Sequence, residues 1–251
     1  MVESRRQGDG HSEYSGKSEL LTSENALASY NRFIIRKFIK YAKLSSLEIG
    51  NRGEHRTLDF GAGYGTLALI WRDLTGNHVE CLEIDEQQRL EIEARGFIGW
   101  NSVAEIKSKF HFIYTSNVLE HIENDESSLV ELAELLESGG RLGIYVPAFM
   151  ILFSDLDRSV GHYRRYGKQE LIDKVERAGL NIVNCKYVDS LGFFASIAVK
   201  VIGYKSVGNI GSASSLKLYD TLIFPISRII DRITFGKILG KNLLLIAEKV
   251  N

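Results

Sequence analysis

Short apolar segments alternate with helix-like segments through most of this chain, and this alternation constrains the fold more than any other feature. The apolar segments carry few polar residues on either face, as strands do when both faces of a sheet are covered. Strands that alternate with helices form a parallel sheet between two layers of helices, so the sequence predicts an α/β fold. The expected strands are 56–60, 78–84, 97–103, 110–117 and 141–148, and the expected helices between them are 66–74, 85–96 and 124–138.

Further elements are expected on both sides of this core. Apolar residues at helical spacing predict an amphipathic helix at 25–44, whereas the polar residues 1–24 are expected to form a flexible N-terminus. Gly139 and Gly140 are expected to end the helix at 124–138. We therefore expect one domain at 25–251, which ends with a helix at 168–178 and strands at 180–188 and 242–250. Between these two strands we expect a helical cap at about 189–240. The cap should contain a Gly/Ser-rich turn at 208–215 and an interruption at Pro225.

Length and composition exclude several classes of protein. With 251 residues and a formal net charge of -1, the chain is expected to be one globular domain without an overall basic field for nucleic acid. Its two cysteines, Cys81 and Cys185, support neither a disulfide framework nor a zinc site, so buried thiols and no bound metal are expected. The N-terminus has no apolar core for a signal peptide, and residues 190–199 are too short to span a bilayer. We therefore expect a cytoplasmic protein.

A glycine-rich turn lies between the first expected strand and the helix after it. Gly61, Gly63 and Gly65 stand there at GxGxG spacing, where backbone amides can approach a ligand without interference from a Cβ atom. The glycines could also serve only to permit the turn. A dinucleotide site would need a glycine at position 66 for close packing of helix and strand, and Thr66 stands there instead.

Two acidic residues follow the second expected strand, at the edge where open α/β sheets bind their ligands. Glu83 ends that strand, and its carboxylate can accept hydrogen bonds from the two hydroxyls of a ribose. Asp85 stands directly before the next helix, where we expect it to act mainly as the N-cap. The sequence therefore favours Glu83 as the ligand-binding acid.

These motifs, taken in order, resemble those of class I methyltransferases that use S-adenosylmethionine. The resemblance is carried by DFGAGYG, LEID, FHFIYTSNVLEHIEND and LLESGGRLGIYVPA, and covers roughly residues 25–188 and the last strand. It implies a Rossmann-like seven-stranded sheet of order 3-2-1-4-5-7-6 with the last strand antiparallel. It also implies that S-adenosylmethionine is the cofactor and that its binding residues are Asp59, Gly61, Gly63, Gly65, Glu83 and Asn117.

The acceptor side is expected in the charged and aromatic loop at 149–167. Methyl transfer mainly requires alignment of the acceptor with the methyl group, and a general base can add to the rate. His121 and His162 are the predicted catalytic residues, although His121 could instead only organise its loop, and Asp155 and Asp157 are further candidates for a base. Residues predicted to bind substrate are Tyr163, Arg164, Arg165 and Tyr166, with the alternative that these arginines neutralise nearby carboxylates as a structural network.

The loop sequence SDLDRSVGHYRRYGKQEL also resembles a bacterial, methyltransferase type 11-like subgroup with a GHYRRY loop. A methyltransferase that acts on a small-molecule, lipid-linked or saccharide-linked acceptor is therefore the first hypothesis. The second is a protein that binds S-adenosylmethionine but has lost catalysis. A nicotinamide dehydrogenase is the third, and Thr66 argues against it.

The expected cap adds a question about partners. Leu218, Leu222, Ile229, Ile230 and Ile233 recur at helical spacing beside basic residues. Such a helix can roof the acceptor pocket, which we favour, or contact anionic lipid at the inner face of the membrane. No nucleic-acid partner is expected, and the sequence leaves the acceptor and the oligomeric state open.

Overall fold

The computed structural model describes residues 26–44, 55–202, 212–234 and 236–250. Within them the chain forms a seven-stranded sheet of order β3-β2-β1-β4-β5-β7-β6, in which β7 runs antiparallel to both of its neighbours. This topology confirms the Rossmann-like fold expected from the sequence. The strands are β1 (Thr57–Phe60), β2 (Glu80–Leu82), β3 (Gly99–Trp100), β4 (Phe110–Ser116), β5 (Leu136–Pro147), β6 (Leu180–Val188) and β7 (Asn242–Lys249).

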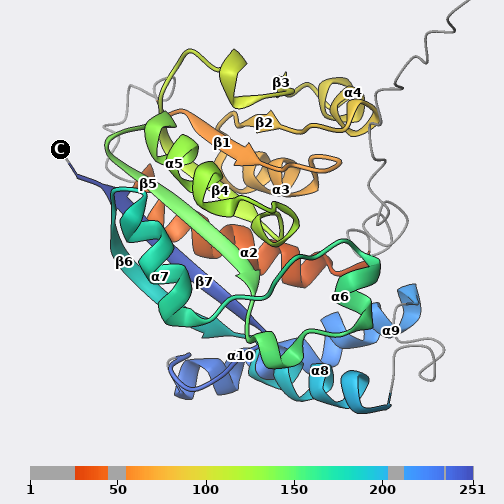
Figure 1. The fold of residues 1–251 in the computed structure, drawn as a ribbon. Coiled ribbons are helices and arrows are strands. Elements are labelled where there is room, and N and C mark those ends of the chain that lie inside the picture. Colours follow the sequence, from red (N-terminus) through yellow and green to blue (C-terminus); the bar gives the residue numbers. More distant parts are fainter. Residues whose placement is uncertain (1–25, 45–54, 203–211, 235, 251) are drawn as a thin grey trace, which may run out of the picture.

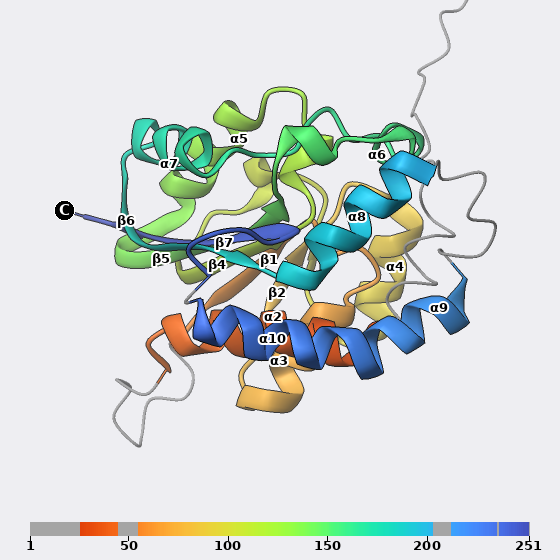
Figure 2. The ribbon, with the colours of Figure 1, turned by 90° about the horizontal axis from the view of Figure 1, so that it is seen from below.

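Helices cover both faces of the sheet (Figures 1 and 2), because the strands bury side chains on both sides. One apolar core contains Leu129 and Leu171 and lies beneath α5 and α7. The other contains Phe38, Trp71 and Ile92 and lies beneath α2, α3 and α4. The helices of this body are α2 (Ala28–Tyr41), α3 (Thr66–Thr75), α4 (Glu86–Ala94), α5 (Asp125–Leu135) and α7 (Lys168–Arg177).

The expected helix at 124–138 is wrong at its C-terminal end. Helix α5 ends at Leu135, and β5 begins at Leu136, which pairs with Phe110 of β4. The pairing then skips to Phe112 and Arg141, so Gly139 and Gly140 lie in an irregularity within β5 rather than at a helix end. Strand pairing therefore overrides the helical periodicity of these last residues. The strand expected at 97–103 is also shorter than predicted, since β3 contains two residues.

A cap of helices joins β6 to β7. It contains α8 (Ser190–Ile202), α9 (Ala213–Leu218), the π-helical turn η5 (Tyr219–Ile223) and α10 (Phe224–Ile233). The helical run continues past Pro225, but it is irregular there, because the π-helical turn η5 ends at Ile223 and Pro225 lies in the first turn of α10. The carboxylate of Asp220 accepts backbone N–H bonds from Ser29 and Tyr30, both at 2.8 Å, and so ties the cap to α2.

The segment expected to be a functional loop connects β5 to α7. It contains two short helical turns, η4 (Met150–Leu152) and α6 (Asp155–Ser159). Figure 1 shows this connection beside the cap, on the side of the sheet where β5 ends. The predicted flexible N-terminus at 1–24 and residues 208–211 of the predicted Gly/Ser-rich turn lie outside the described residues. The rest of that turn, 212–215, is instead the N-cap and first residues of α9. None of the described helices has the length and hydropathy required to cross a membrane.

Candidate cofactor and acceptor site

The glycine turn is built from left-handed backbone. Gly61, Gly63 and Gly65 have φ angles of 76°, 56° and 77°. Residues other than glycine adopt this left-handed conformation at a cost of about 1 to 2 kcal/mol. The N–H groups of Gly61 and Ala62 donate to the carbonyl of Leu82 at 2.9 and 3.0 Å. These bonds hold the turn against the end of β2, with helix α3 starting directly after it.

Glu83 connects this turn to the second strand. Its Oε2 atom accepts the N–H of Gly63 at 2.8 Å, and its Oε1 atom accepts the N–H of Asp85 at 3.0 Å. Burial raises the pKa of Glu83, and the backbone hydrogen bonds oppose this effect. Each carboxylate oxygen has a second lone pair, so Glu83 can still accept bonds from ligand hydroxyls. Asp85 accepts the N–H of Gln88 at 3.1 Å, which confirms its expected role as the N-cap of α4.

Two other residues implied to bind the cofactor lie at the ends of β1 and β4. Asp59 is buried in β1 and accepts a hydrogen bond from the hydroxyl of Tyr114 at 3.1 Å. Asn117 follows β4 directly, is exposed, and has a positive φ of 54°. Its N–H donates to the carbonyl of Tyr145 at 2.8 Å, which keeps the end of β4 beside β5.

These residues fit the shape and chemistry of S-adenosylmethionine. The glycines place no Cβ atom in the turn, and Glu83 offers acceptors suited to the two hydroxyls of a ribose. Ile84 follows Glu83 and is 80% exposed, so it offers an apolar surface beside the carboxylate. The glycine turn, Glu83 and Ile84 would therefore hold the cofactor, with Asn117 at the same edge of the sheet.

The two predicted catalytic histidines lie together, although they come from different elements. His121 belongs to η3 (Leu119–His121), whereas His162 follows α6, and their ring centroids are 4.5 Å apart. Burial, and then the neighbouring His162, lower the pKa of His121 to about 4. His121 is therefore neutral at neutral pH.

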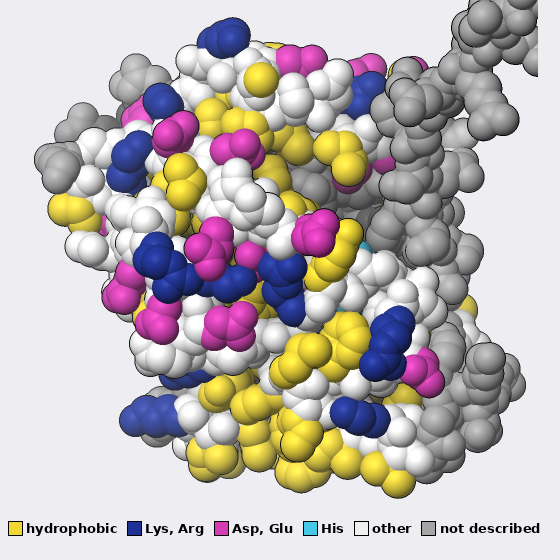
Figure 3. All heavy atoms as spheres, viewed as in Figure 1, with side chains coloured by type: hydrophobic (Ala, Val, Ile, Leu, Met, Phe, Trp, Pro, Cys, Tyr) yellow, Lys and Arg dark blue, Asp and Glu magenta, His cyan; other side chains and the backbone are white. Residues whose placement is uncertain are grey.

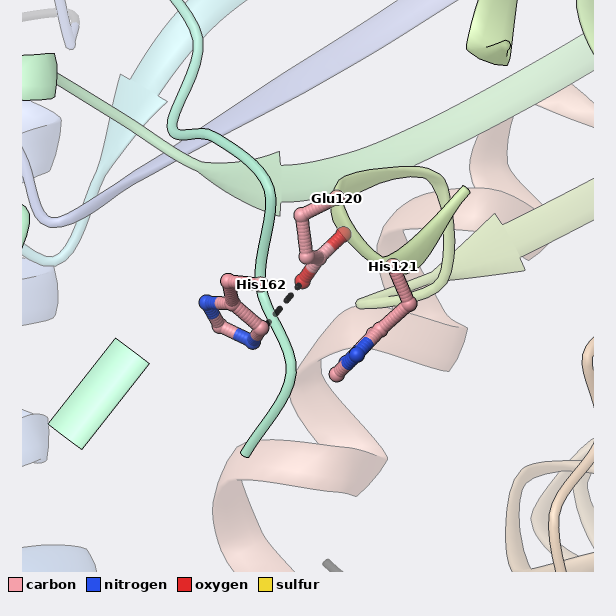
Figure 4. Close-up of side chains that lie close together, drawn as sticks. All are labelled: Glu120, His121 and His162. Atoms are coloured by element: carbon pink, nitrogen blue, oxygen red, sulfur yellow. Dashed lines mark ion pairs between the residues drawn. The ribbon is translucent and has the colours of Figure 1, made fainter. Parts of the chain in front are cut away.

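Glu120 completes this cluster, and sequence reasoning missed it. Its side chain is fully buried, and neither carboxyl oxygen has a hydrogen-bond partner among the described residues. Its Oε1 atom lies 4.0 Å from Nε2 of His162, and Figure 4 shows Glu120 and the two imidazoles converging. Burial raises the pKa of Glu120 to about 8. Glu120 was assigned no role from the sequence, because its meeting with His162 joins segments 42 residues apart in the chain.

Asp157 holds His162 in place. Its Oδ1 atom accepts a hydrogen bond from Nδ1 of His162 at 2.9 Å, and both of its oxygens accept bonds from Arg165. Although burial opposes the effect, the bonds from His162 and Arg165 bring the pKa of Asp157 well below its usual range. Asp157 is thus ionised and fixes the orientation of the imidazole, while Asp155 is exposed and pairs with Arg158.

Three of the four predicted substrate-binding residues have partners within the chain. Arg165 binds Asp157, while Arg164 and the hydroxyl of Tyr166 contact Asp125 at 2.8 and 2.7 Å. Both arginines thus pair with nearby carboxylates, as in the alternative in which they form a structural network. Tyr163 differs, because its side chain is 52% exposed. Substrate binding by these residues stays a prediction.

The fold and the site together define a class of protein. A seven-stranded sheet of order 3-2-1-4-5-7-6, with a left-handed glycine turn after β1 and an acidic residue after β2, is the arrangement of the Rossmann-like methyltransferases. The profile of the family described as "Methyltransferase domain" matches residues 29–184, which is more than half of the chain. The chain belongs to this methyltransferase domain family. The narrower subgroup with a GHYRRY loop stays a prediction.

Solved structures of low sequence identity share the fold. A SAM dependent methyltransferase from Archaeoglobus fulgidus aligns with a TM-score of 0.53 and 16% identity over 87% of this chain and 94% of that one. Phosphoethanolamine N-methyltransferase 2 of Haemonchus contortus, in complex with S-adenosyl-L-methionine, aligns with a TM-score of 0.55 and 14% identity over 86% of this chain and 52% of that one. The [4+2]-cyclase SpnF aligns with a TM-score of 0.50 and 16% identity over 84% and 81% of the two chains. None of the curated proteins compared with the chain matches it.

Proposed function

We propose that this protein transfers the methyl group of S-adenosylmethionine to a small-molecule, lipid-linked or saccharide-linked acceptor. The observation that carries the proposal is the pairing of Glu83 with the glycine turn through the N–H of Gly63, within a chain of the methyltransferase domain family. S-adenosylmethionine supplies a methyl group already activated by a sulfonium. The protein therefore has to bind the cofactor, orient the acceptor and exclude water.

The acceptor would lie between the cofactor edge and the connection from β5 to α7. Glu120, His121 and His162 come from this region, and they form a polar cluster in which Glu120 is buried and the two histidines are half-buried. The bond between Nδ1 of His162 and Asp157 leaves Nε2 of His162 directed at Glu120, toward the cluster. The grouping of the two histidines supports the proposal that one of them handles the acceptor proton.

We also propose that the cap rests on an anionic membrane surface. The outer side of η5 and α10 exposes Leu222, Ile226, Ile229 and Ile233, each more than half exposed. Figure 3 shows the opposite part of the cap, where hydrophobic side chains gather at the lower edge of the molecule over α8. A pocket of about 610 Å³ adjoins α10, and five cationic side chains line it: Lys37, Lys186, Arg228, Arg232 and Lys237. An apolar helix face beside clustered cations suits the surface of anionic lipid, where a lipid-linked acceptor would reside.

The alternative function is a protein that binds S-adenosylmethionine without transferring its methyl group. The likeness to the cyclase SpnF supports retaining this alternative, because it shows that the fold also occurs in a protein named for another reaction. Calorimetric titration with S-adenosylmethionine, followed by incubation of the protein with labelled cofactor and a cell extract, separates the two. Binding with label transfer supports a methyltransferase, binding without transfer supports the alternative, and no binding contradicts both.

A further inference from the structure

The cluster of Glu120, His121 and His162 has the composition of a metal site. One ligand atom from each side chain lies within 4.8 Å of the corresponding atoms of the other two. Two imidazoles and one carboxylate are a ligand set that first-row divalent metals occupy in proteins, with further coordination positions open for substrate. This chemistry requires no cysteine, so the absence of a CxxC unit does not exclude it.

Hydrogen bonds orient the two histidines of the cluster. Nδ1 of His162 lies 2.9 Å from Oδ1 of Asp157, and its Nε2 atom faces Oε1 of Glu120 at 4.0 Å. His121 makes a hydrogen bond with the backbone of Gly161. Histidines that ligate metals are commonly oriented in this way, by a carboxylate or a carbonyl at the other ring nitrogen.

The burial of the Glu120 carboxyl group without a hydrogen-bond partner is a second and independent observation. Its carboxyl group has no exposed surface and no hydrogen-bond partner among the described residues, and it is directed at His162. The 4.0 Å between Oε1 of Glu120 and Nε2 of His162 is too long for a hydrogen bond, and a cation between the two atoms would give both of them a partner. Arg165 does not fill this role, because its Nε and Nη2 atoms donate to Asp157 and its Nη1 atom has no hydrogen-bond partner among the described residues.

We propose that Glu120, His121 and His162 bind one first-row divalent cation, such as Mn²⁺, Co²⁺ or Zn²⁺, which holds an oxygen-bearing acceptor beside the cofactor. Ligand atoms at about 2.0 to 2.2 Å from one tetrahedral ion are about 3.3 to 3.6 Å apart, so the three side chains, whose ligand atoms lie within 4.8 Å of one another, have to move together by up to about 1.5 Å when the ion binds. The ion balances the charge of Glu120, and its open positions would orient an acceptor hydroxyl or carboxylate. The role in acceptor binding rests on the proposed function, whereas the binding of the ion does not.

The test begins with metal binding alone. The full chain is stripped with a chelator and titrated calorimetrically with Mn²⁺, Co²⁺ and Zn²⁺, and the visible spectrum of the Co²⁺ form reports ligation by nitrogen. We expect one saturable site per chain, and at least a tenfold loss of affinity in Glu120→Gln and in His162→Ala. His78→Ala is the matched control, because His78 is exposed and distant in sequence from the cluster, and it should bind the ions as the unchanged protein does.

Folding is monitored separately, because His162→Ala also removes a partner of Asp157. Glu120→Gln keeps the size of the side chain and replaces a buried carboxyl group by a neutral amide, so its melting temperature without metal should be nearly unchanged. Added metal should raise the melting temperature of the unchanged protein and of His78→Ala but not that of Glu120→Gln. The absence of saturable binding, or equal binding by Glu120→Gln and His162→Ala when both remain folded, would overturn the proposal. Neither result bears on the affinity for S-adenosylmethionine, which is measured on the same samples.

Discussion

The carboxylate of Glu83 accepts the backbone N–H of Gly63 at 2.8 Å, although 20 residues separate the two in sequence. This bond joins the turn after β1 to the end of β2, the two places where the family motifs stand. The acid therefore has two functions at once: it orients the glycine turn and presents its remaining lone pairs to a ribose. Loss of either partner should affect cofactor binding before it affects the rest of the fold.

Glu83→Ala and Gly63→Ala should each weaken the binding of S-adenosylmethionine. The first change removes charge-assisted hydrogen bonds worth about 1.5 to 3 kcal/mol, which corresponds to a loss of affinity of roughly 10- to 150-fold. The second places a Cβ atom on left-handed backbone, where φ is 56°. Calorimetric titration with the cofactor measures both effects. Asp85→Ala is the control, since it should lower stability by about 1 kcal/mol through loss of the helix cap while the cofactor affinity stays nearly unchanged. Normal affinity in both site variants would contradict the assignment.

Arg165→Ala should destabilise the protein, whereas Tyr163→Ala should not. Arg165 is buried in a two-bond contact with Asp157, and removing one partner of such a pair lowers the free energy of unfolding by about 3 to 5 kcal/mol. Thermal unfolding would then shift downward by roughly 6 to 20 °C for a domain of this size. Tyr163 is half exposed, so its removal should leave the melting temperature within about 2 °C. If Tyr163→Ala reduces turnover without this shift, Tyr163 binds the acceptor. A stable Arg165→Ala variant with lower turnover would instead support substrate binding by Arg165.

Asp125 should make stability depend on pH in the acid range. Burial opposes ionisation of this carboxyl, but hydrogen bonds from Lys174 and Tyr166 and the charge of Arg164 bring its pKa below the usual range. A lowered pKa means that the stabilisation is fully present above the unfolded value of about 3.9 and is lost as the pH falls through the folded value. Asp125→Asn should therefore unfold about 1 to 3 kcal/mol more easily at pH 7, and less so at pH 3. Urea unfolding measures the free energy of unfolding of the variant and of the unchanged protein at both pH values. A loss of stability that is the same at pH 7 and pH 3 would exclude this role for the charge of Asp125.

Vesicle flotation tests the surface of the cap. Ile229→Ser combined with Ile233→Ser should abolish co-flotation with anionic vesicles, because it removes two exposed side chains from the apolar side of α10. Leu90→Ser is the matched control, since Leu90 is similarly exposed but lies on α4. Phe193 is a poor target, because its ring packs against Phe149 within the structure. Binding that weakens with salt would indicate the contribution of the cations around the pocket, and a lack of vesicle binding at any salt concentration would leave the cap as a cover of the acceptor site only.

The local sequence by itself predicted the strands, the glycine turn and the acid after β2, whereas the order of the strands in the sheet came from the family resemblance. Each of these depends on a local pattern: apolar runs mark the strands, glycine marks the positive φ angles, and Glu83 follows its strand directly. Asp85 as an N-cap is equally local, since it bonds the residue three positions later. Such features are predictable because neighbours in sequence are also neighbours in space.

Only the tertiary structure decided how the acceptor side is arranged. The end of α5 depends on the pairing of Leu136 with Phe110, which no helical pattern reveals. The meeting of Glu120 with His162, and the use of Arg165 to hold Asp157, require the connection after β5 to fold back against the turn after β4. The backbone N–H of Tyr163 donates to the carbonyl of Glu120 at 2.8 Å and secures this return. Contacts between segments far apart in the chain are set by the packing of the whole sheet, so no local pattern of residues encodes them.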